Sequence, residues 1–422
     1  MEGNHRILLA CRGVEARRLQ RSAADLGLEV AALVGDDDDE ASWAEGFDYT
    51  MFLLNPWPTA SEVVGLALDA GCDLIHPGWG ALARQGELMG RSQMVGLTTV
   101  GPHPAHLQLV ADGSQIRDLA AELDIPVVPG SAPCEELADI EAWLAVVGFP
   151  AMVRLTADLD GAWIPIPEDA AARQETLAAL LSQGSVVLER AVETAREIEV
   201  LVAGQSSGEA LTLGERETSI RVDGQRAVVE SPVVDLNEEQ AFHFRQAAAM
   251  LVSRLRWPGL VSVRFLLTPD GRAYLLRLRP GLQPWHAVTE EILGIDLVDA
   301  QLRIAMDEEL GWEPYHFDEK GHSFCLRLFA IGTEPGPLTT LKLPEDVRLL
   351  RGFEQGDVIR PGEEIAQIVV HAPTRHAAFV RARVALENVE IDGMDSNLPM
   401  LKSLFERKDL WDAPQSRDRF QI

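Results

Sequence analysis

The stretch "VRFLLTPDGRAYLLRLRPG", residues 263–281, decides how the middle of the chain is interpreted. Two apolar runs flank residues 268–271, and a Pro-Asp-Gly turn between such runs is typical of a β-hairpin. On the second strand Arg277 and Arg279 alternate with leucines, so both guanidiniums are expected on one face. Arginine is rarely buried without a partner. That face therefore looks onto carboxylates, a bound anion or water.

Strands before the hairpin extend it into an antiparallel layer. Residues 197–204, 209–220 and 226–232 are predicted to form a meander of three strands, and helices at 238–256 and 289–308 complete the layer.

The first hundred residues have a different pattern, in which helices alternate with strands. Strands are expected at 6–11, 29–35, 72–78 and 97–102, and helices at 12–27 and 59–71. Such alternation, beginning with a βαβ unit, predicts an α/β fold.

Composition and charge exclude several classes of protein. A chain of 422 residues with 46% hydrophobic content is long enough for two or three domains. The formal charge of −29 argues against a general nucleic-acid or anionic-membrane binder. No apolar stretch approaches the roughly 18 residues of a membrane span, and the start lacks the features of a signal peptide, so a cytoplasmic protein is expected.

Cysteine and lysine are sparse. The four cysteines, at 11, 72, 134 and 325, are widely spaced and are expected to be reduced core thiols. Lysine occurs only at 320, 342, 402 and 408, so no lysine before Lys320 can act in catalysis. The acidic run 36–46 is predicted to be a solvated loop, because no spacing pattern orders its carboxylates around a metal.

Five segments, in chain order, resemble motifs of the biotin carboxylase family within the ATP-grasp fold. They are "ACRGVEARRL" (10–19), "CDLIHPGWGALAR" (72–84), "GPHPAHLQLVADGSQIRDLAAELDIPVVPG" (101–130), "GERETSIRVDGQRAVVESP" (214–232) and "QPWHAVTEEILGIDLVDAQLRIA" (283–305). The resemblance implies an α/β ATP-grasp fold of biotin carboxylase type. Its parts would be an N-terminal Rossmann-like domain (1–112), an ATP-grasp domain (113–310) with an α/β lid at about 132–200, and a C-terminal α+β domain (311–422).

The residues expected to hold phosphates depart from the family pattern. The lysine of M-G-D-K is Gly113 here, and the lysine of the lid strand is Arg154. The loop "TADLDGAWIP" (156–165) has one glycine where the family has four or five. Side chains such as Leu159 and Trp163 would keep backbone amides away from a phosphate.

The metal and bicarbonate positions depart further. The family places two glutamates and an asparagine on the hairpin strands, and those positions are Arg264, Arg277 and Arg279 here. Cations in place of anions would repel Mg²⁺ by several kcal/mol at a few Å, even at an effective dielectric of about 20. The glutamate of Q-V-E-H is Trp285, and an arginine that positions the bicarbonate anion is Gly281.

Some family positions keep related residues. Arg327 matches the arginine on the biotin side, Arg226 replaces a lysine, and Arg154 is expected to face the same cleft. Glu189 corresponds to the hinge beside the adenine. His286 is interpreted as a core histidine, and His76 as a structural turn residue. Trp163 and Trp285 would fill the cleft as core aromatics.

Two interpretations of the Arg264, Arg277 and Arg279 group stay open. In one, each guanidinium pairs with a carboxylate and fills space once used by metal and nucleotide; the candidate partners are Glu189, Glu199, Glu215 and Glu290. In the other, the pocket binds an anion without metal, such as a phosphate ester, an acidic metabolite or an acidic peptide tail.

The functional hypothesis is a catalytically silent biotin carboxylase homologue that serves as a structural or regulatory subunit of a biotin-dependent acyl-CoA carboxylase system. ATP and Mg²⁺ are expected to be lost or very weakly bound, and biotin or carboxybiotin would be met only through a partner. Expected partners are an active biotin carboxylase, a biotin carrier protein or a carboxyltransferase, in a homodimer or heterodimer. The alternatives are an anion-binding sensor protein and a divergent ATP-dependent ligase.

Overall fold

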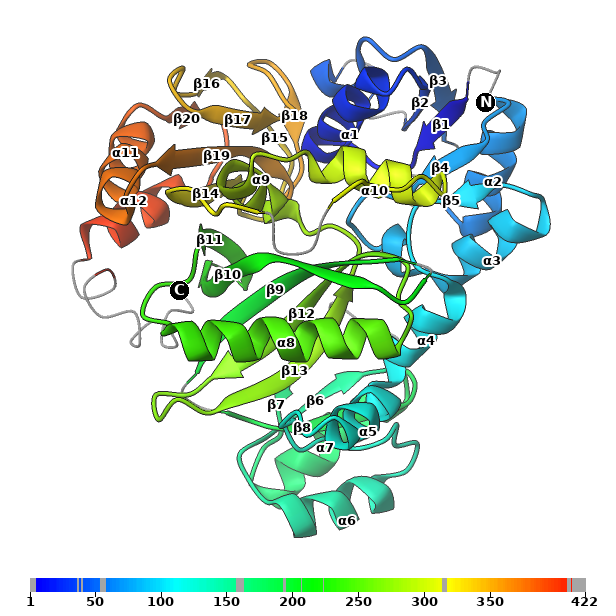
Figure 1. Ribbon diagram of the computed structural model, residues 1–422, viewed down its shortest axis with the longest axis vertical. Helices are drawn as coiled ribbons and strands as arrows, with labels where there is room; N and C mark the ends of the chain where they lie inside the picture. The colour runs from blue at the N-terminus through cyan, green and yellow to red at the C-terminus, as the bar shows by residue number, and fades with distance from the viewer. Residues whose placement is uncertain are drawn as a thin grey trace.

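The computed structural model describes residues 5–35, 38, 41–53, 58–156, 163–192, 195–205, 207–222, 224–312, 317–407 and 411. Figure 1 shows three regions around one large sheet: an N-terminal α/β region, a small lid at the far end, and a C-terminal region beside the first. No helix among these residues is long and apolar enough to cross a membrane.

The N-terminal region is a parallel sheet flanked by helices. Its strands, in the order β3-β2-β1-β4-β5, are β1 (Arg6–Leu9), β2 (Glu29–Val34), β3 (Tyr49–Phe52), β4 (Leu74–His76) and β5 (Thr98–Thr99). Helices α1 (Gly13–Asp25), α2 (Ala60–Asp69) and α3 (Gly86–Met94) connect them. The predicted βαβ start is confirmed, although the strand expected at 97–102 is only two residues long. Because β1 has β2 on one side and β4 on the other, the carboxyl ends of these strands form a switch point.

An eight-stranded sheet forms the centre of the molecule, in the order β13-β12-β9-β10-β11-β14-β19-β17. The predicted hairpin is present as β12 (Gly259–Leu267) and β13 (Ala273–Pro280). The predicted meander is also present, as β9 (Arg196–Gly204), β10 (Ala210–Val222) and β11 (Gln225–Ser231). Helix α8 (Glu238–Arg254) covers one face of these strands (Figure 1).

The helix expected at 289–308 is two helices. Helix α9 (Ala287–Leu293) ends before Gly294, which has a left-handed φ of 68°. Helix α10 (Leu297–Ala305) follows Asp296, whose side chain caps it by accepting a hydrogen bond from the Asp299 amide. A left-handed glycine directly after the last turn is a common helix stop. A short helical turn, Pro284–His286, precedes α9 on the face of the sheet opposite α8.

The lid is a three-stranded antiparallel sheet with two helices. Strands β6 (Ala151–Leu155), β7 (Ile164–Pro165) and β8 (Val186–Arg190) have the order β7-β6-β8, and α6 (Leu137–Val147) and α7 (Ala170–Leu181) pack on them. Helices α4 (Pro104–Asp112) and α5 (Ser114–Glu122) connect the lid to the N-terminal region.

The C-terminal region continues the central sheet through β14 (His322–Phe329), β19 (Glu364–Ala372) and β17 (Arg348–Arg351). Helices α11 (Arg375–Glu387) and α12 (Leu398–Glu406) pack against it, and their apolar residues join those of β14 and β19 in one core cluster. Two small ribbons complete the region, β15 (Gly336–Pro337) with β18 (Val358–Ile359), and β16 (Thr340–Lys342) with β20 (Glu390–Asp392).

A β-bulge in β10 sets the register around the centre of the sheet. The pairing of β10 with β9 shifts between Thr212 and Glu215, at Gly214, whose φ of 78° is left-handed. After the shift, Glu215 lies opposite Val200 and Arg216 lies opposite Glu199. A one-residue change of register moves every following side chain to the other face, so this bulge decides which charges meet.

Candidate functional site

Three buried side chains form a row across the central sheet. The register places Arg216 of β10 and Arg264 of β12 on either side of Glu199 of β9. Arg216 Nη2 lies 2.6 Å from Glu199 Oε1, and Arg264 Nε donates to Oε2 at 2.8 Å. Each of these side chains is at most 1% exposed. Both guanidiniums therefore share the Glu199 carboxylate.

Hydrogen bonds satisfy most of the remaining polar atoms of this row. Trp285 Nε1 donates to Glu199 Oε1 at 3.1 Å. Arg216 donates to Thr289 Oγ1 at 3.1 Å and to Ser262 Oγ at 3.0 Å. Burial by itself would raise the pKa of Glu199, but Arg216 and Arg264 outweigh it and hold this pKa at about 2. Glu199 is thus ionised at neutral pH.

Glu197, two residues earlier on β9, holds a second set of guanidiniums. Arg221 Nη2 lies 2.9 Å from its Oε2, Arg264 Nη1 lies 3.4 Å from its Oε1, and Arg226 donates to the same Oε1. Burial opposes ionisation here too, yet Arg226 and Arg264 keep the pKa of Glu197 well below its usual range. We call Glu197, Glu199, Arg216, Arg226, Arg264 and Trp285 the Glu199 cluster.

The indole of Trp285 lies among three of these cations. The guanidinium carbons of Arg226, Arg264 and Arg327 lie 5.2, 5.6 and 5.5 Å from its ring centroid, within cation–π range. Arg327 Nε also donates to Glu364 at 2.6 Å. Trp285 is 4% exposed and fills the space between these side chains.

A second group of charged residues lies where the lid meets β13. Two guanidinium carbons lie near the centroid of the Trp163 ring. That of Arg154, on lid strand β6, is 5.2 Å away, and that of Arg277, on β13, is 5.4 Å away. Glu189 of β8 lines the same cleft, and burial raises its pKa even though Arg277 and Arg117 favour the charged form. The space left inside this cleft is only about 30 Å³.

The other predicted site residues lie outside both groups. Arg279 is buried on β13 opposite Ser262. His286 is fully buried, packs 5.1 Å from the Trp79 ring and binds the Gln283 carbonyl oxygen through Nδ1 at 3.0 Å. Burial lowers the pKa of His286 to about 4, so its ring is neutral at physiological pH.

Two of the four predicted carboxylate partners are wrong. Glu215 lies on the other face of the sheet because of the Gly214 bulge, and accepts from Arg245 of α8 at 2.6 Å. Glu290 accepts from Arg18 of α1 at 2.8 Å, and also binds Arg348.

Sequence reasoning missed the roles of Glu197, Arg216 and Arg221. The signal for Glu197 was present in "EIEVLV" (197–202), where its spacing from Glu199 puts both carboxylates on one face of a strand. For Arg216 the signal was hidden, because the bulge that aims it at Glu199 is not evident from alternation alone.

Comparison with protein families covers nearly the whole chain. Residues 3–107 match the family model of the biotin carboxylase N-terminal domain, and residues 330–417 match that of the biotin carboxylase C-terminal domain. Residues 112–312 match the ATP binding domain of the carbamoyl-phosphate synthase L chain. The chain belongs to the biotin carboxylase family.

Curated relatives and solved structures agree with this family. The chain is 29% identical to a biotin carboxylase from Halalkalibacterium halodurans, over 94% of this chain and 93% of that protein. It is 28% identical to the 2-oxoglutarate carboxylase small subunit of Hydrogenobacter thermophilus, over 97% and 91%. The biotin carboxylase domain dimer of the latter enzyme, solved with MgADP, ADP and bicarbonate, superimposes with a TM-score of 0.89 at 26% identity and covers 96% of this chain and 95% of that one. The biotin carboxylase type of ATP-grasp fold is thereby confirmed.

A biotin carboxylase is expected to hold Mg²⁺ and ATP in this cleft, but the described residues of this chain do not fit them. Mg²⁺ takes oxygen ligands, and the two β9 carboxylates nearest the expected position are already bound by guanidiniums. Ligand pockets typically measure about 300–1,000 Å³, against about 30 Å³ between Arg154, Arg277 and Glu189. The loop expected to cover the phosphates lies mostly outside the described residues, at 157–162.

The stacking of Trp163 between Arg154 and Arg277 holds the lid against the central sheet. We expect Trp163→Ala to increase amide hydrogen exchange in β6 and β8 by roughly 5- to 30-fold, since two cation–π contacts are worth about 1–2 kcal/mol together. Hydrogen exchange measured by mass spectrometry on the whole chain tests this. Trp163→Phe, which keeps a ring, should stay close to the unsubstituted protein. Equal exchange in all three proteins would contradict a holding role for this ring.

Proposed function

We propose that this biotin carboxylase homologue is catalytically silent and acts as a structural or regulatory subunit of a biotin-dependent acyl-CoA carboxylase system. The observation that carries the proposal is the Glu199 cluster. Arg264 stands where the family places a metal-binding glutamate, and it is held there by Glu199 and Glu197 rather than turned outward to solvent. Binding of Mg²⁺ would require these ion pairs to break inside a buried site, which is strongly unfavourable.

The proposed partners are an active biotin carboxylase, a biotin carrier protein or a carboxyltransferase. Support comes from relatives that carry subunit names, among them the methylcrotonoyl-CoA carboxylase subunit alpha of rice, which is 29% identical over 94% of this chain and 58% of that protein. A homodimer or heterodimer is part of the proposal, supported by the dimeric biotin carboxylase domain of Hydrogenobacter thermophilus. Contact with biotin or carboxybiotin would come through a partner, on the side of Arg327.

The two alternative functions find less support in the described residues. An anion sensor is expected to use Arg154, Arg264, Arg277 and Arg279, and of these Arg264 already has the carboxylates of Glu199 and Glu197 within 3.4 Å. A divergent ligase would need displaced acidic ligands, and the described residues contain no group of three or more histidine, cysteine, aspartate or glutamate side chains that could hold a metal ion.

Calorimetric titration with MgATP and a bicarbonate-dependent ATPase assay test the silent state. We expect no saturable heat and no turnover above the background, with the biotin carboxylase domain of Hydrogenobacter thermophilus as the active reference. The protein is expressed with an affinity tag, and a second purification step removes the carboxylase of the expression host. Saturable, Mg²⁺-dependent turnover that disappears in Glu197→Gln would overturn the proposal, because a contaminating enzyme would not respond to that substitution. The same tagged protein is then used as bait in a lysate of the native organism. Capture of a carboxylase subunit from this lysate supports the subunit role.

A further inference from the structure

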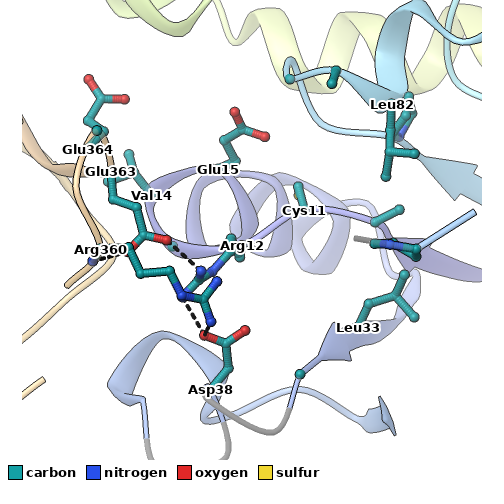
Figure 2. A pocket seen from close by; sticks show the side chains of 18 of the residues that line it. Cys11, Arg12, Val14, Glu15, Leu33, Asp38, Leu82, Arg360, Glu363 and Glu364 are labelled. Carbon is teal, nitrogen blue, oxygen red and sulfur yellow. Dashed lines mark hydrogen bonds and ion pairs between the residues drawn. The ribbon is translucent and has the colours of Figure 1, made fainter. Parts of the chain in front are cut away.

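Two arginines that line the cavity in Figure 2 are held by carboxylates. Figure 2 shows Arg12 between Asp38 and Glu363, in a cavity of about 540 Å³ that lies between the N-terminal and C-terminal regions. Arg327 in the same cavity donates to Glu364 at 2.6 Å. The charges of these two arginines are therefore balanced by neighbouring side chains.

A smaller cavity, of about 270 Å³, lies between the start of helix α8 and the turn of the β12–β13 hairpin. Its apolar lining consists of Ala195, Leu267 and Pro269. The volume is below the roughly 300–1,000 Å³ of most ligand pockets, so it suits a ligand smaller than a nucleotide. Three polar side chains, Arg196, Asp235 and Gln240, also line this cavity and decide what it can bind.

Arg196, the first residue of β9, brings a buried guanidinium to this cavity. Its side chain is 7% exposed, and its Nε and Nη2 donate to Glu217 at 3.1 and 2.7 Å. Nη2 also donates to the Val234 carbonyl oxygen at 2.8 Å. Nη1 has no hydrogen-bond partner among the described residues, so its N–H groups stay available to a ligand. Since side chains alternate along a strand, Arg196 points away from the face that carries the Glu199 cluster.

Asp235 brings a free carboxylate. It directly follows Val234, whose carbonyl oxygen binds Arg196. No hydrogen bond or ion pair, however, joins the Asp235 side chain to Arg196 or to another described residue. Its φ of 55° is left-handed, a conformation that is uncommon outside glycine and that Asp and Asn tolerate best. A guanidinium and a carboxylate thus line one small cavity without forming an ion pair with each other.

Gln240, in the first turn of α8, adds a second free donor. Its Oε1 accepts from the Asn237 amide at 3.2 Å, as part of the capping box that begins this helix. This bond orients the side-chain amide and leaves its Nε2 without a partner among the described residues. The three polar side chains therefore offer two donor groups, Arg196 Nη1 and Gln240 Nε2, and one charged acceptor, the Asp235 carboxylate.

We propose that this cavity binds a free α-amino acid with a short aliphatic side chain. The carboxylate of the amino acid accepts hydrogen bonds from Arg196 Nη1 and Gln240 Nε2. Its ammonium group donates to Asp235, and its side chain lies against Leu267 and Pro269. A ligand that carries both charges satisfies all three polar side chains at once, through charge-assisted hydrogen bonds. The site lies beyond the proposed subunit function and needs neither ATP nor metal.

Saturation-transfer NMR titrations of the full chain at pH 7 with L-valine, valinamide and N-acetylvaline test the proposal. Valinamide keeps the ammonium group and N-acetylvaline keeps the carboxylate, so each can make only part of the charged contacts. L-Valine is expected to bind about tenfold more tightly than either analogue, because each analogue leaves one charged partner in the cavity without its contact.

Two variants separate the two ends of the ligand. Asp235→Asn keeps a residue that tolerates the left-handed φ. It should weaken L-valine and valinamide about tenfold and leave N-acetylvaline unchanged, because it removes the partner of the ammonium group. Gln240→Glu keeps a capping-box residue but repels a carboxylate, so it should weaken L-valine and N-acetylvaline and not valinamide. Asp307→Asn is the matched control: Asp307 is exposed and left-handed, with a φ of 58°, but does not line the cavity, and its substitution should leave binding unchanged.

Three results would overturn the inference. The first is no detectable binding of L-valine. The second is an analogue that binds as tightly as L-valine, which would indicate one end of a peptide rather than a free amino acid. The third is equal L-valine affinity in Asp235→Asn and the unsubstituted protein, which would place the bound amino acid elsewhere. None of these results depends on the ATPase assay, so this inference and the proposed function fail separately.

Discussion

Glu199→Gln should lower the free energy of unfolding by about 3–5 kcal/mol, because it leaves buried Arg216 without its anionic partner and buried Arg264 with Glu197 alone. The side chain keeps its size and can still accept hydrogen bonds, so the loss reports charge rather than volume. Urea denaturation at pH 7 and 25 °C measures it. Glu390→Gln is the matched control: Glu390 also binds a cation, Lys342, but is 57% exposed, and its substitution should change stability little.

The pH dependence of the same variant gives an independent check. The pKa of Glu199 is lowered from 4.5 to about 2 in the folded chain. Its contribution is therefore fully present above pH 4.5 and is lost as the pH falls toward 2, a change of roughly 3 kcal/mol. Stability of the unsubstituted protein should fall by that additional amount over this range, relative to Glu199→Gln. Parallel curves for the two proteins would show that Glu199 does not carry this charge balance.

Replacing Glu199, Arg216 and Arg264 together by uncharged residues separates two free energies. One is the cost of removing a single partner, and the other is the net contribution of all three charges to stability. The triple variant Glu199→Leu, Arg216→Met, Arg264→Met removes all three charges together. Replacing a whole buried ion group with apolar residues is often neutral or even stabilising by about 1–4 kcal/mol. We therefore expect the triple variant to be more stable than Glu199→Gln. If it is less stable, the row contributes net stabilisation beyond charge balance.

Arg18→Ala is expected to cost about 3 kcal/mol of unfolding free energy, because a buried carboxylate loses a partner. Arg18 of α1 is 4% exposed at its side chain and lies 2.8 Å from Glu290 of α9 and 2.9 Å from Asp296 before α10. These pairs join the N-terminal region to the two helices that follow the hairpin. The measurement is urea denaturation at pH 7.

Arg303→Ala is the control for this substitution. Arg303 pairs with Asp299 one helical turn away, at 2.7 Å, but is 39% exposed. Exposed pairs of this type contribute little. Equal losses from Arg18→Ala and Arg303→Ala would mean that burial of the Arg18 pairs does not matter to the fold.

The sequence predicted most of the central sheet because its signals are local. The Pro-Asp-Gly turn places the ends of β12 and β13, and the alternation of Arg277 and Arg279 with leucines fixes which residues share a face. Collinear motifs then supplied the family, which pattern reasoning alone could not. Arg264 lies 2.8 Å from Glu199, which is one of the four carboxylates named as candidate partners of the arginine group.

Failures arose where partners are chosen across strands. Glu215 and Arg216 are successive residues of one strand and so point to opposite faces, but the bulge at Gly214 decides which of them faces Glu199, and only the register with β9 reveals it. The prediction of a single helix over 289–308 fails at Gly294, because the apolar pattern continues on both sides of this glycine. Partner choice in the lid, between Trp163, Arg154 and Arg277, likewise depends on how two separate sheets meet.

The pairing of β11 with β14 bears on where cooperative unfolding stops. Backbone hydrogen bonds join Val228 to Leu326 and their neighbours across the boundary that sequence motifs draw near residue 310. One continuous set of strands therefore carries both the ATP-grasp core and the C-terminal region. The boundary between the two sequence motifs therefore does not separate two folding units in this chain. If the strands on one side unfold, an edge strand of the other side becomes exposed.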